Sequence, residues 1–326
     1  MPSGDQYAYH STWSKCYNKE LPVTFPENFV NSIAFYNTEQ QPKGFNQTHV
    51  QYFVNSNGDV ITDRTSHLAY LCNGHSDGKA IRRMEEIYSH VFIDELQDYA
   101  GWDLEIIRLL FESQIQITCV GDYKQATYWT NNSPKNKQYR DEKIRDYFNM
   151  LQKKGLCTTS YKNTTRRFNQ EICDFVNTIY RDTDSMIEPS SELAKEQSAN
   201  NSGGYMLDVK YLSEYCKSYH PTILRYNKKT KINFQHSCDV FNYGGAKGET
   251  YERVVIVPVS TTLPFIEKQA KIDSNQTKAK FYVACTRAKY SIVFAINKPK
   301  ENDVFKSIEL YFDGKVIPAY KYYNKE

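Results

Sequence analysis

Two adjacent carboxylates, Asp94 and Glu95, follow a short apolar run in the segment HVFIDELQD, residues 90–98. An acid at the end of a strand can hold Mg²⁺, and a neighbouring acid can position or deprotonate a water molecule. Nucleotide hydrolysis needs both of these roles. The simpler alternative is that the carboxylates cap the next helix, and this segment alone leaves both interpretations open.

Four further side chains fit the same chemistry. Gln125 follows another short apolar run, in VGDYKQ. Because the carboxyl ends of neighbouring parallel strands meet at one edge of a sheet, Gln125 is expected near the two acids, where it can sense a γ-phosphate or its attacking water. Arg166 and Arg167 lie in TTRRFNQEI and Arg287 lies in FYVACTRAK. Arginines that face a nucleotide across a cleft supply the charge that phosphoryl transfer requires.

Alternating strands and helices are expected to position these groups. The pattern from residue 90 onward predicts a strand at 91–93, a helix at 101–113, a strand at 115–120 and a helix that stops at Gly155. This alternation is typical of a parallel sheet. The unbroken apolar run at 91–93 also predicts that both faces of that strand are covered.

The second half repeats the α/β pattern after a boundary near 155–162. Asn169 is expected to cap a helix with one apolar stripe, and the polar stretch 181–204 is expected to be an exposed excursion. Strands are predicted at 222–226, 253–259 and 291–296, with a helix at 277–289.

Length and composition set outer limits. A chain of 326 residues is long enough for roughly two domains. The 41 Lys and Arg nearly balance the 38 Asp and Glu, so any nucleic-acid site must be local. The eight cysteines include no CxxC pair, which favours reduced thiols over a zinc site. Since no apolar stretch approaches the roughly 20 residues of a membrane helix, we expect a cytoplasmic protein without a membrane partner.

Five segments taken together resemble the UvrD/Rep-type superfamily 1 helicases: IDELQD, VGDYKQATY, RRFNQEICDFVN, GGAKGETYERVVIV and YVACTRAK. The resemblance covers residues 90 to about 297 and implies an α/β protein of two RecA-like domains, the P-loop NTPase helicase fold. It further implies ATP and Mg²⁺ between the domains and movement along single-stranded DNA. On this interpretation, 1–85 is a poorly readable N-terminal segment, 86–155 is the remainder of an incomplete first RecA-like domain, and 156–326 is the second.

The resemblance also assigns roles in the hydrolytic site. Asp94 matches the magnesium-holding acid, with Glu95 beside the metal as the catalytic base. Gln125 matches the γ-phosphate sensor. Arg167 and Arg287 match the two arginine fingers.

Other positions follow from the same resemblance. Arg166 occupies the slot of an adenine-stacking aromatic and would stack as a planar guanidinium. Lys247 and Gly248 resemble the turn that links the state of ATP to the grip on DNA, although alone they suggest a surface turn. Tyr128 and Trp129 lie where the family places aromatics that stack DNA bases, with core packing as the alternative.

One expected segment is missing from the sequence. No GxxxxGK[ST] loop occurs, and the nearest string, NGHSDGKA at 73–80, has Asn73 and Ala80 in place of the first Gly and the Ser/Thr. We interpret it as an ordinary turn before a helix. Either residues 1–85 fill the gap, or a partner chain supplies the phosphate-binding loop, or the sequence is a piece of a longer helicase. The alternative to an ATP-dependent DNA helicase is therefore a non-hydrolysing DNA-binding or partner-docking subunit.

A weaker similarity concerns the loops TNNSPKNK and PTILRYNKKT. They resemble a short-bodied branch of these helicases, including those encoded beside OLD-family nucleases in anti-phage systems such as Gabija. This similarity implies anti-phage defence or DNA repair as the setting, and a nuclease subunit as one partner.

Overall fold

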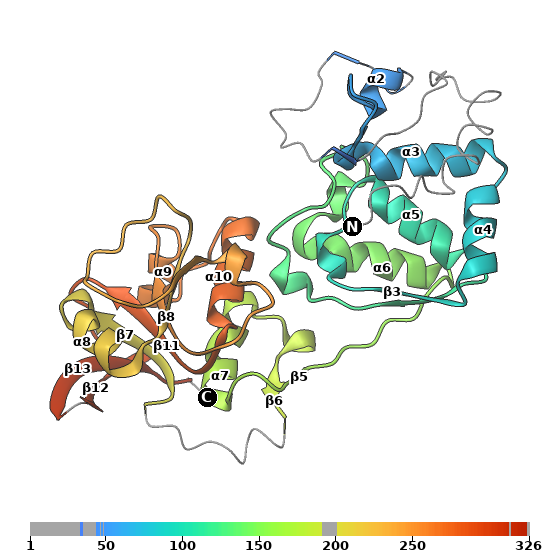
Figure 1. Ribbon diagram of the computed structural model, residues 1–326. Coiled ribbons are helices and arrows are strands. Elements are labelled where there is room, and N and C mark those ends of the chain that lie inside the picture. Colours follow the sequence, from blue (N-terminus) through green and yellow to red (C-terminus); the bar gives the residue numbers. More distant parts are fainter. Residues whose placement is uncertain are drawn as a thin grey trace. The chain divides into compact units, whose positions relative to one another are not determined.

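The computed structural model describes residues 33–34, 44–45, 47, 49–190, 201–312 and 314–324. The described chain forms two compact units, which Figure 1 shows in the blue-to-green and the yellow-to-red parts of the ribbon. Unit 1 contains the residues up to Tyr123 together with Tyr128–Thr159. Unit 2 contains Lys124–Thr127 and the residues from Ser160 onward. Within the described ranges, no helix is long and apolar enough to cross a membrane.

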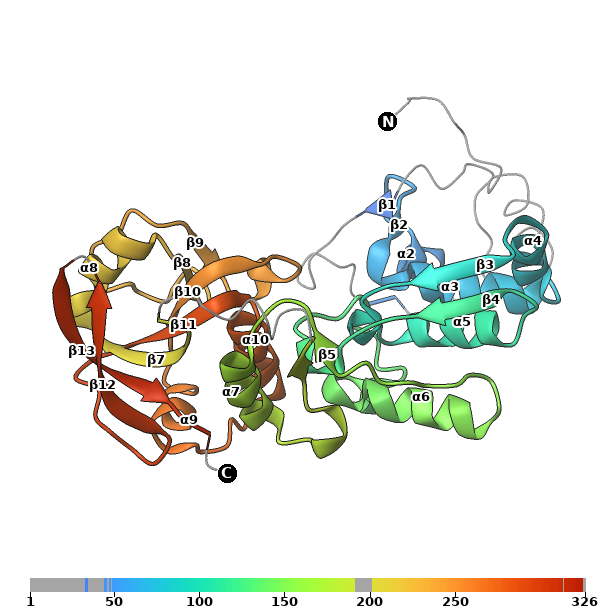
Figure 2. The ribbon, with the colours of Figure 1, turned by 90° about the horizontal axis from the view of Figure 1, so that it is seen from below.

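Unit 1 packs helices on a small parallel sheet (Figures 1 and 2). Its strands are β1 (Ile33–Ala34), β2 (Val60–Ile61), β3 (His90–Ile93) and β4 (Gln116–Cys119). Its helices are α2 (Val50–Phe53), α3 (Thr62–His75), α4 (Lys79–Ile87), α5 (Trp102–Phe111) and α6 (Ile144–Lys153). The pairs β1–β2 and β3–β4 are both parallel. The strand, helix, strand and helix predicted from residue 90 onward are confirmed as β3, α5, β4 and α6.

One face of the β3–β4 pair carries the core of unit 1. Leu104 and Ile107 of α5 are buried, as are Ile144 and Leu151 of α6, and they share one apolar cluster with Ile93. The apolar residues of each helix recur at three- and four-residue spacing, which puts them on the side that meets the sheet. Because β3 ends inside this cluster, the position of its carboxyl end is fixed by helix packing.

The other face of β3 differs from the prediction. Phe92 keeps 72% of its surface exposed, so the expectation that both faces of the strand are covered is wrong at this residue. The His90 ring stacks on Phe92 with 4.0 Å between centroids, and its Nε2 lies 2.8 Å from Thr118 Oγ1. A run of apolar residues indicates a strand, but it does not say how many layers pack on the sheet.

The N-terminal segment that showed no periodicity contains helices. The helix α3 and most of α4 lie within residues 1–85, and Leu68 of α3 packs with Phe53 of α2 in a small separate core. The helix α3 was missed because its buried positions include His67, Cys72 and Asn73, which do not form a clear apolar stripe. Residues 1–32, 35–43, 46 and 48 lie outside the described residues.

Unit 2 is built around a seven-stranded sheet. Its strands are β5 (Thr164–Thr165), β6 (Glu188–Pro189), β7 (Gly203–Asp208), β8 (Thr222–Arg225), β9 (Val240–Asn242), β10 (Tyr251–Val257), β11 (Ala288–Ile296), β12 (Phe305–Phe312) and β13 (Lys315–Tyr322). Its helices are α7 (Gln170–Tyr180), α8 (Val209–Tyr219), α9 (Leu263–Lys268) and α10 (Asn275–Cys285). The strand pair β5–β6 stands apart from the large sheet.

The order of the large sheet is β12-β13-β7-β11-β10-β8-β9. Strands β7, β11, β10, β8 and β9 are parallel, and the β12–β13 hairpin extends the sheet in antiparallel fashion. Helices α7, α9 and α10 pack on one face, while α8 packs on the other. Figure 2 shows α7 and α10 side by side in this unit. Unit 2 is therefore a three-layer α/β structure, and the predicted fold class is confirmed at this level.

The predicted strands of this half are confirmed as β8, β10 and β11, and two boundaries are corrected. The stretch 181–204 is not an exposed excursion throughout, because Gly203 and Gly204 are buried at the start of β7. The predicted helix 277–289 ends earlier, at Cys285, and Ala288 already belongs to β11. The start of β7 could not be predicted because it consists of two glycines, and glycine is depleted in strands.

The predicted cap of α7 is confirmed, and it gives a stability test. Asn169 Oδ1 accepts a hydrogen bond of 3.1 Å from the Ile172 amide. We expect Asn169→Ala to lower the free energy of unfolding by about 0.5–2 kcal/mol, because a first-turn amide loses its acceptor. Urea denaturation measures this change, and Asn169→Ser, which restores an acceptor, should recover most of it. Equal stability of wild type and Asn169→Ala would contradict the role of the cap.

Candidate functional site

Both strand-end acids lie at the carboxyl end of β3, and both are exposed. The Glu95 amide donates to Asp94 Oδ1 at 2.7 Å. Glu95 has φ 51° and ψ 43°, a left-handed conformation that is uncommon for a residue with a Cβ. No side chain caps α5, whose N-cap is Gly101, so the helix-capping interpretation of the carboxylates is wrong for this helix. The sharp turn instead leaves both carboxylates at the end of the strand.

Gln97 connects these acids to the next strand. It is only 2% exposed, its Nε2 donates to Glu95 Oε2, and its Oε1 accepts from the Asp122 amide at 2.9 Å. A Cβ on Gly121 would lie 2.5 Å from Gln97 Oε1 and 2.9 Å from the Leu96 backbone nitrogen, so this close approach to the backbone requires glycine. The sequence analysis gave Gln97 no role. The only signal of a role in the sequence was a polar residue between acids. The burial of its side chain could not be predicted.

Arg287 forms the centre of a polar cluster in unit 2. The side chain is 1% exposed. Its Nε donates to the Val283 carbonyl at 3.0 Å and its Nη1 to the Glu249 carbonyl at 3.2 Å. Its Nη2 donates to Gln125 Oε1 at 3.2 Å and to Thr286 Oγ1 at 3.0 Å. Each of the three guanidinium nitrogens therefore donates to at least one acceptor.

The second candidate arginine joins the same cluster. Arg167 is half-buried, and its Nη1 donates to the Thr286 carbonyl at 3.3 Å. Thr286 thus contacts both arginines, one through its hydroxyl and one through its carbonyl. Arg287 directly precedes β11 and Glu249 precedes β10, so the cluster lies at the amino ends of these strands. The structure therefore brings three of the predicted residues together: Gln125, Arg167 and Arg287.

Gln125 has its contacts in unit 2. Its expected position near Asp94 and Glu95 stays a prediction, because those acids belong to unit 1 while residues 124–127 pack within unit 2. The reason is local, since Gln125 bonds to Arg287 and its neighbour Lys124 bonds to a turn after α7. That the two acids and the arginines meet at one nucleotide stays a prediction.

The two candidate base-stacking aromatics have different surroundings. Tyr128 is 61% exposed, so its ring is available to a ligand. Trp129 is half-buried, and the Arg140 guanidinium lies 4.9 Å from its ring centroid. The packing alternative therefore describes Trp129, and the exposed Tyr128 remains suited to stacking on a base.

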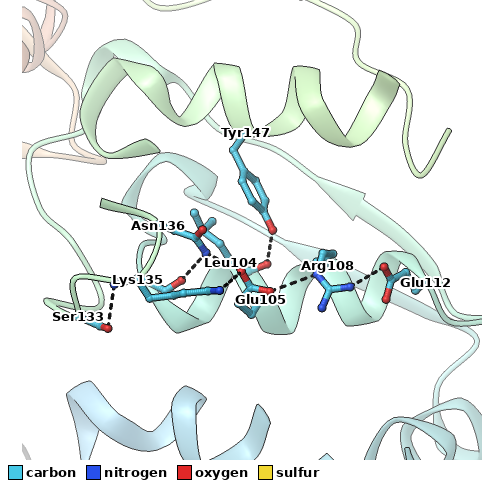
Figure 3. Close-up of polar contacts among 9 residues, drawn as sticks. Leu104, Glu105, Arg108, Glu112, Ser133, Lys135, Asn136 and Tyr147 are labelled. Atoms are coloured by element: carbon cyan, nitrogen blue, oxygen red, sulfur yellow. Dashed lines mark hydrogen bonds and ion pairs between the residues drawn. The ribbon is translucent and has the colours of Figure 1, made fainter. Parts of the chain in front are cut away.

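The loop that follows these aromatics is tied to α5 (Figure 3). Asn136 Nδ2 donates to Glu105 Oε1 at 2.9 Å, and Lys135 Nζ lies 3.4 Å from the same oxygen. Arg108 Nε donates to Glu105 Oε2 at 3.2 Å. Burial of Glu105 raises its pKa, but the hydrogen bonds from Asn136 and Arg108, together with the nearby Lys135, outweigh burial and leave the pKa below its ordinary value. Lys135 thus has a carboxylate partner within its own unit.

The remaining predicted positions lie at the surface or in turns. Arg166 is exposed. Lys247 follows the short turn Gly244–Ala246, and its amide donates to the Gly244 carbonyl at 3.3 Å. Gly248 is exposed with φ 85°, a conformation that favours glycine. These positions suit both a binding role and an ordinary turn, so the roles of the three residues stay predictions.

The string at 73–80 is a turn between two helices, as predicted. The helix α3 ends at His75 and α4 begins at Lys79, with Gly78 in the left-handed conformation between them. A phosphate-binding loop follows a strand, so this turn is not one. Within the described ranges, no group of three or more His, Cys, Asp or Glu side chains is arranged to hold a metal ion.

Taken together, the fold and these groups define an α/β protein with exposed acids at a strand end in unit 1 and a buried arginine cluster in unit 2. Residues 6–145 match the UvrD/REP helicase N-terminal domain family. This part of the chain is therefore similar to a UvrD-type helicase N-terminal domain, and the match supports the resemblance where the two overlap, at residues 90–145.

Comparison with solved structures gave more distant similarities. The arterivirus nonstructural protein 10 helicase is 14% identical, with 63% of this chain and 38% of that chain covered and a TM-score of 0.36. The same helicase in complex with DNA is 16% identical, with 63% and 39% covered and a TM-score of 0.37. The C-terminal domain of a possible DNA helicase from Lactobacillus plantarum is 13% identical, with 44% and 91% covered and a TM-score of 0.25. The chain thus spans less than half of the arterivirus helicase. No curated protein sequence matched.

Proposed function

We propose that this protein acts as an ATP-dependent DNA helicase or translocase of the UvrD type, in which two RecA-like domains hydrolyse ATP and move along single-stranded DNA. The family match over residues 6–145 supports the class. The observation that carries the proposal is the cluster in unit 2, where Arg287 bonds to Gln125 and Arg167 bonds to the adjoining Thr286. Two arginines beside a glutamine suit the charge of a transferring phosphoryl group.

The residues fit Mg²⁺-ATP in part. Asp94 has the type of ligand that Mg²⁺ takes alongside water and phosphate oxygens, and its exposed position leaves room for them. The arginine cluster suits a triphosphate's charge. The sequence, however, contains no GxxxxGK[ST] loop to form a backbone cradle for phosphates. A partner chain would supply that cradle.

Each side chain has a separate role in this proposal. Bound Mg²⁺-ATP supplies the phosphoryl group and the electrophilic charge. Asp94 would hold the metal, and Glu95 would accept the proton of the attacking water. Gln125 would orient that water, and the two arginines would stabilise negative charge as the phosphoryl group transfers.

The direct test is phosphate release by the purified chain with and without a single-stranded oligonucleotide. We expect release that requires Mg²⁺ and rises with the oligonucleotide. Absence of any ATP hydrolysis under both conditions would contradict the proposal for this chain.

A second candidate function is a non-hydrolysing DNA-binding or partner-docking subunit. The missing GxxxxGK[ST] favours it, together with the finding that residues 73–80 are a turn between helices. Binding of labelled ATP at millimolar concentration separates the two functions. If ATP fails to bind while single-stranded DNA binds, the second function replaces the first.

The exposed Tyr128 gives a test on DNA binding. We expect Tyr128→Ala to weaken binding of single-stranded DNA by about 1–3 kcal/mol, because base-aromatic stacking contributes that amount, while Tyr128→Phe keeps the affinity. Fluorescence anisotropy with a labelled oligonucleotide measures this. Tyr311, an exposed tyrosine of β12 in unit 2, is the matched control, and Tyr311→Ala should leave the affinity unchanged. An equal loss in both alanine variants would argue against a stacking site at Tyr128.

A further inference from the structure

Lys124, the residue before the candidate phosphate sensor, is a buried lysine. It is 3% exposed, although lysine is almost never fully buried without a partner. Its Nζ donates to the Ser185 carbonyl at 2.6 Å. The same nitrogen lies 5.9 Å from the ring centroid of Tyr180 and 5.8 Å from that of Tyr282, within range of cation-π attraction. The proposed hydrolysis gives this ammonium group no part, so its burial needs another explanation.

The backbone of Lys124 is held by the same part of unit 2. The Tyr180 hydroxyl donates to the Lys124 carbonyl at 2.9 Å. Tyr180 is the last residue of α7, and Ser185 ends the short turn Thr183–Ser185 that follows it. Side chain and main chain of Lys124 are therefore both bound to the C-terminal end of α7.

Within three residues, the chain passes from contacts in unit 1 to contacts in unit 2. The Asp122 amide bonds to Gln97 of unit 1, whereas Lys124 bonds to Ser185 of unit 2. The next residue, Gln125, accepts from Arg287 of unit 2. A single residue, Tyr123, lies between Asp122, which bonds in unit 1, and Lys124, which bonds in unit 2. The orientation of Gln125 therefore depends on where Lys124 is held.

We propose that Lys124 is a positioning residue that fastens segment 124–127 to the end of α7 and so holds Gln125 at Arg287. This inference rests on the proposed function for its catalytic consequence. The attachment itself is a property of unit 2 and can be measured without ATP.

The test compares Lys124→Met with Lys278→Met by hydrogen exchange of the amides of 124–127 in the full chain. Methionine keeps the length of the side chain but cannot donate to Ser185. Lys278 is the matched control, because its Nζ also lies over Tyr180, at 4.4 Å, but from α10. We expect exchange of 124–127 to accelerate about 10-fold or more in Lys124→Met, as for the loss of one charged hydrogen bond, and to be unchanged in Lys278→Met.

A second variant covers the case in which Lys124→Met does not fold. Tyr180→Phe removes only the hydroxyl that holds the Lys124 carbonyl, and it should accelerate exchange of the same segment without affecting α10. Unchanged exchange of 124–127 in the folded variants would overturn the proposal. The same acceleration in Lys278→Met would overturn it as well. Loss of any positive charge near Tyr180 would then be enough to accelerate exchange of the segment.

Kinetics distinguish positioning from general stability. We expect kcat for ATP hydrolysis to fall about 100-fold in Lys124→Met with KM for ATP unchanged, since a misplaced reacting group costs about that much. A fall in thermal stability with unchanged kcat would show a purely structural role and overturn the proposal. If the wild type hydrolyses no ATP, the proposed function fails, and the exchange experiment still decides whether Lys124 holds the segment.

Discussion

Replacing Glu95 by glutamine is expected to reduce DNA-stimulated ATP hydrolysis by about 10²–10⁴-fold, the usual contribution of a general base. Glutamine has nearly the same shape but cannot accept the proton of the attacking water. Its side-chain oxygen can still accept from Gln97, and the exposed position at the end of β3 buries no new polar group. The free energy of unfolding and the affinity for ATP should therefore change little. Phosphate release under saturating ATP, together with urea denaturation, measures both effects.

Glu112→Gln is the matched control for this variant. Glu112 lies at the end of α5, where it accepts from Arg108 at 2.6 Å, and it has no part in the proposed site. We expect it to keep the full rate of hydrolysis. If Glu95→Gln also hydrolyses ATP at the wild-type rate, Glu95 is not the base, and the assignment of the β3 end as the hydrolytic centre loses its main support.

Elements with a regular apolar pattern could be predicted from the sequence. The helix α7 shows why, because Asn169 supplies a cap and Ile172, Val176 and Ile179 recur at helical spacing, and all three are buried. Strands β8, β10 and β11 carry runs of β-branched residues and lie inside the sheet. In these cases local preference and tertiary burial agree, so a local signal is enough.

Elements whose pattern depends on distant partners could not be predicted. The strand β7 opens with two glycines, yet it pairs with β11 and β13 in the sheet. The exposure of Phe92 depends on which layers cover β3, and no local pattern contains that information. Strand β13, which lies between β12 and β7, includes Pro318, which breaks a simple strand pattern.

The types of residue in the site could be predicted from the sequence, but only some of their contacts could. Gln125 and Arg287 are 162 positions apart, and both were singled out because the segments around them resemble one family. Their direct bond comes from the packing of residues 124–127 in unit 2, which the burial of Lys124 accompanies. Nothing in the letters VGDYKQ indicates that this lysine is buried, since lysine in a polar turn is normally exposed.

Arg287→Lys is expected to cause the largest loss of activity. Arginine-finger contacts contribute about 10³–10⁵-fold to phosphoryl transfer, and a lysine cannot reproduce the planar fork of donors. Arg287 donates to four acceptors spread around its guanidinium. One ammonium group cannot reach all of them, so at least one buried acceptor loses its partner, at a cost of about 1–3 kcal/mol in the free energy of unfolding.

The matched control is Arg253→Lys in the same unit. Arg253 Nη1 donates to the Asn201 carbonyl at 2.9 Å and to Ser291 Oγ at 3.0 Å, outside the proposed site. We expect this variant to lose stability in a similar range while it keeps its rate of hydrolysis. Phosphate release and urea denaturation of both variants separate the two effects. If Arg287→Lys loses stability but hydrolyses ATP as fast as Arg253→Lys, the guanidinium holds the amino ends of β10 and β11 together and takes no part in phosphoryl transfer.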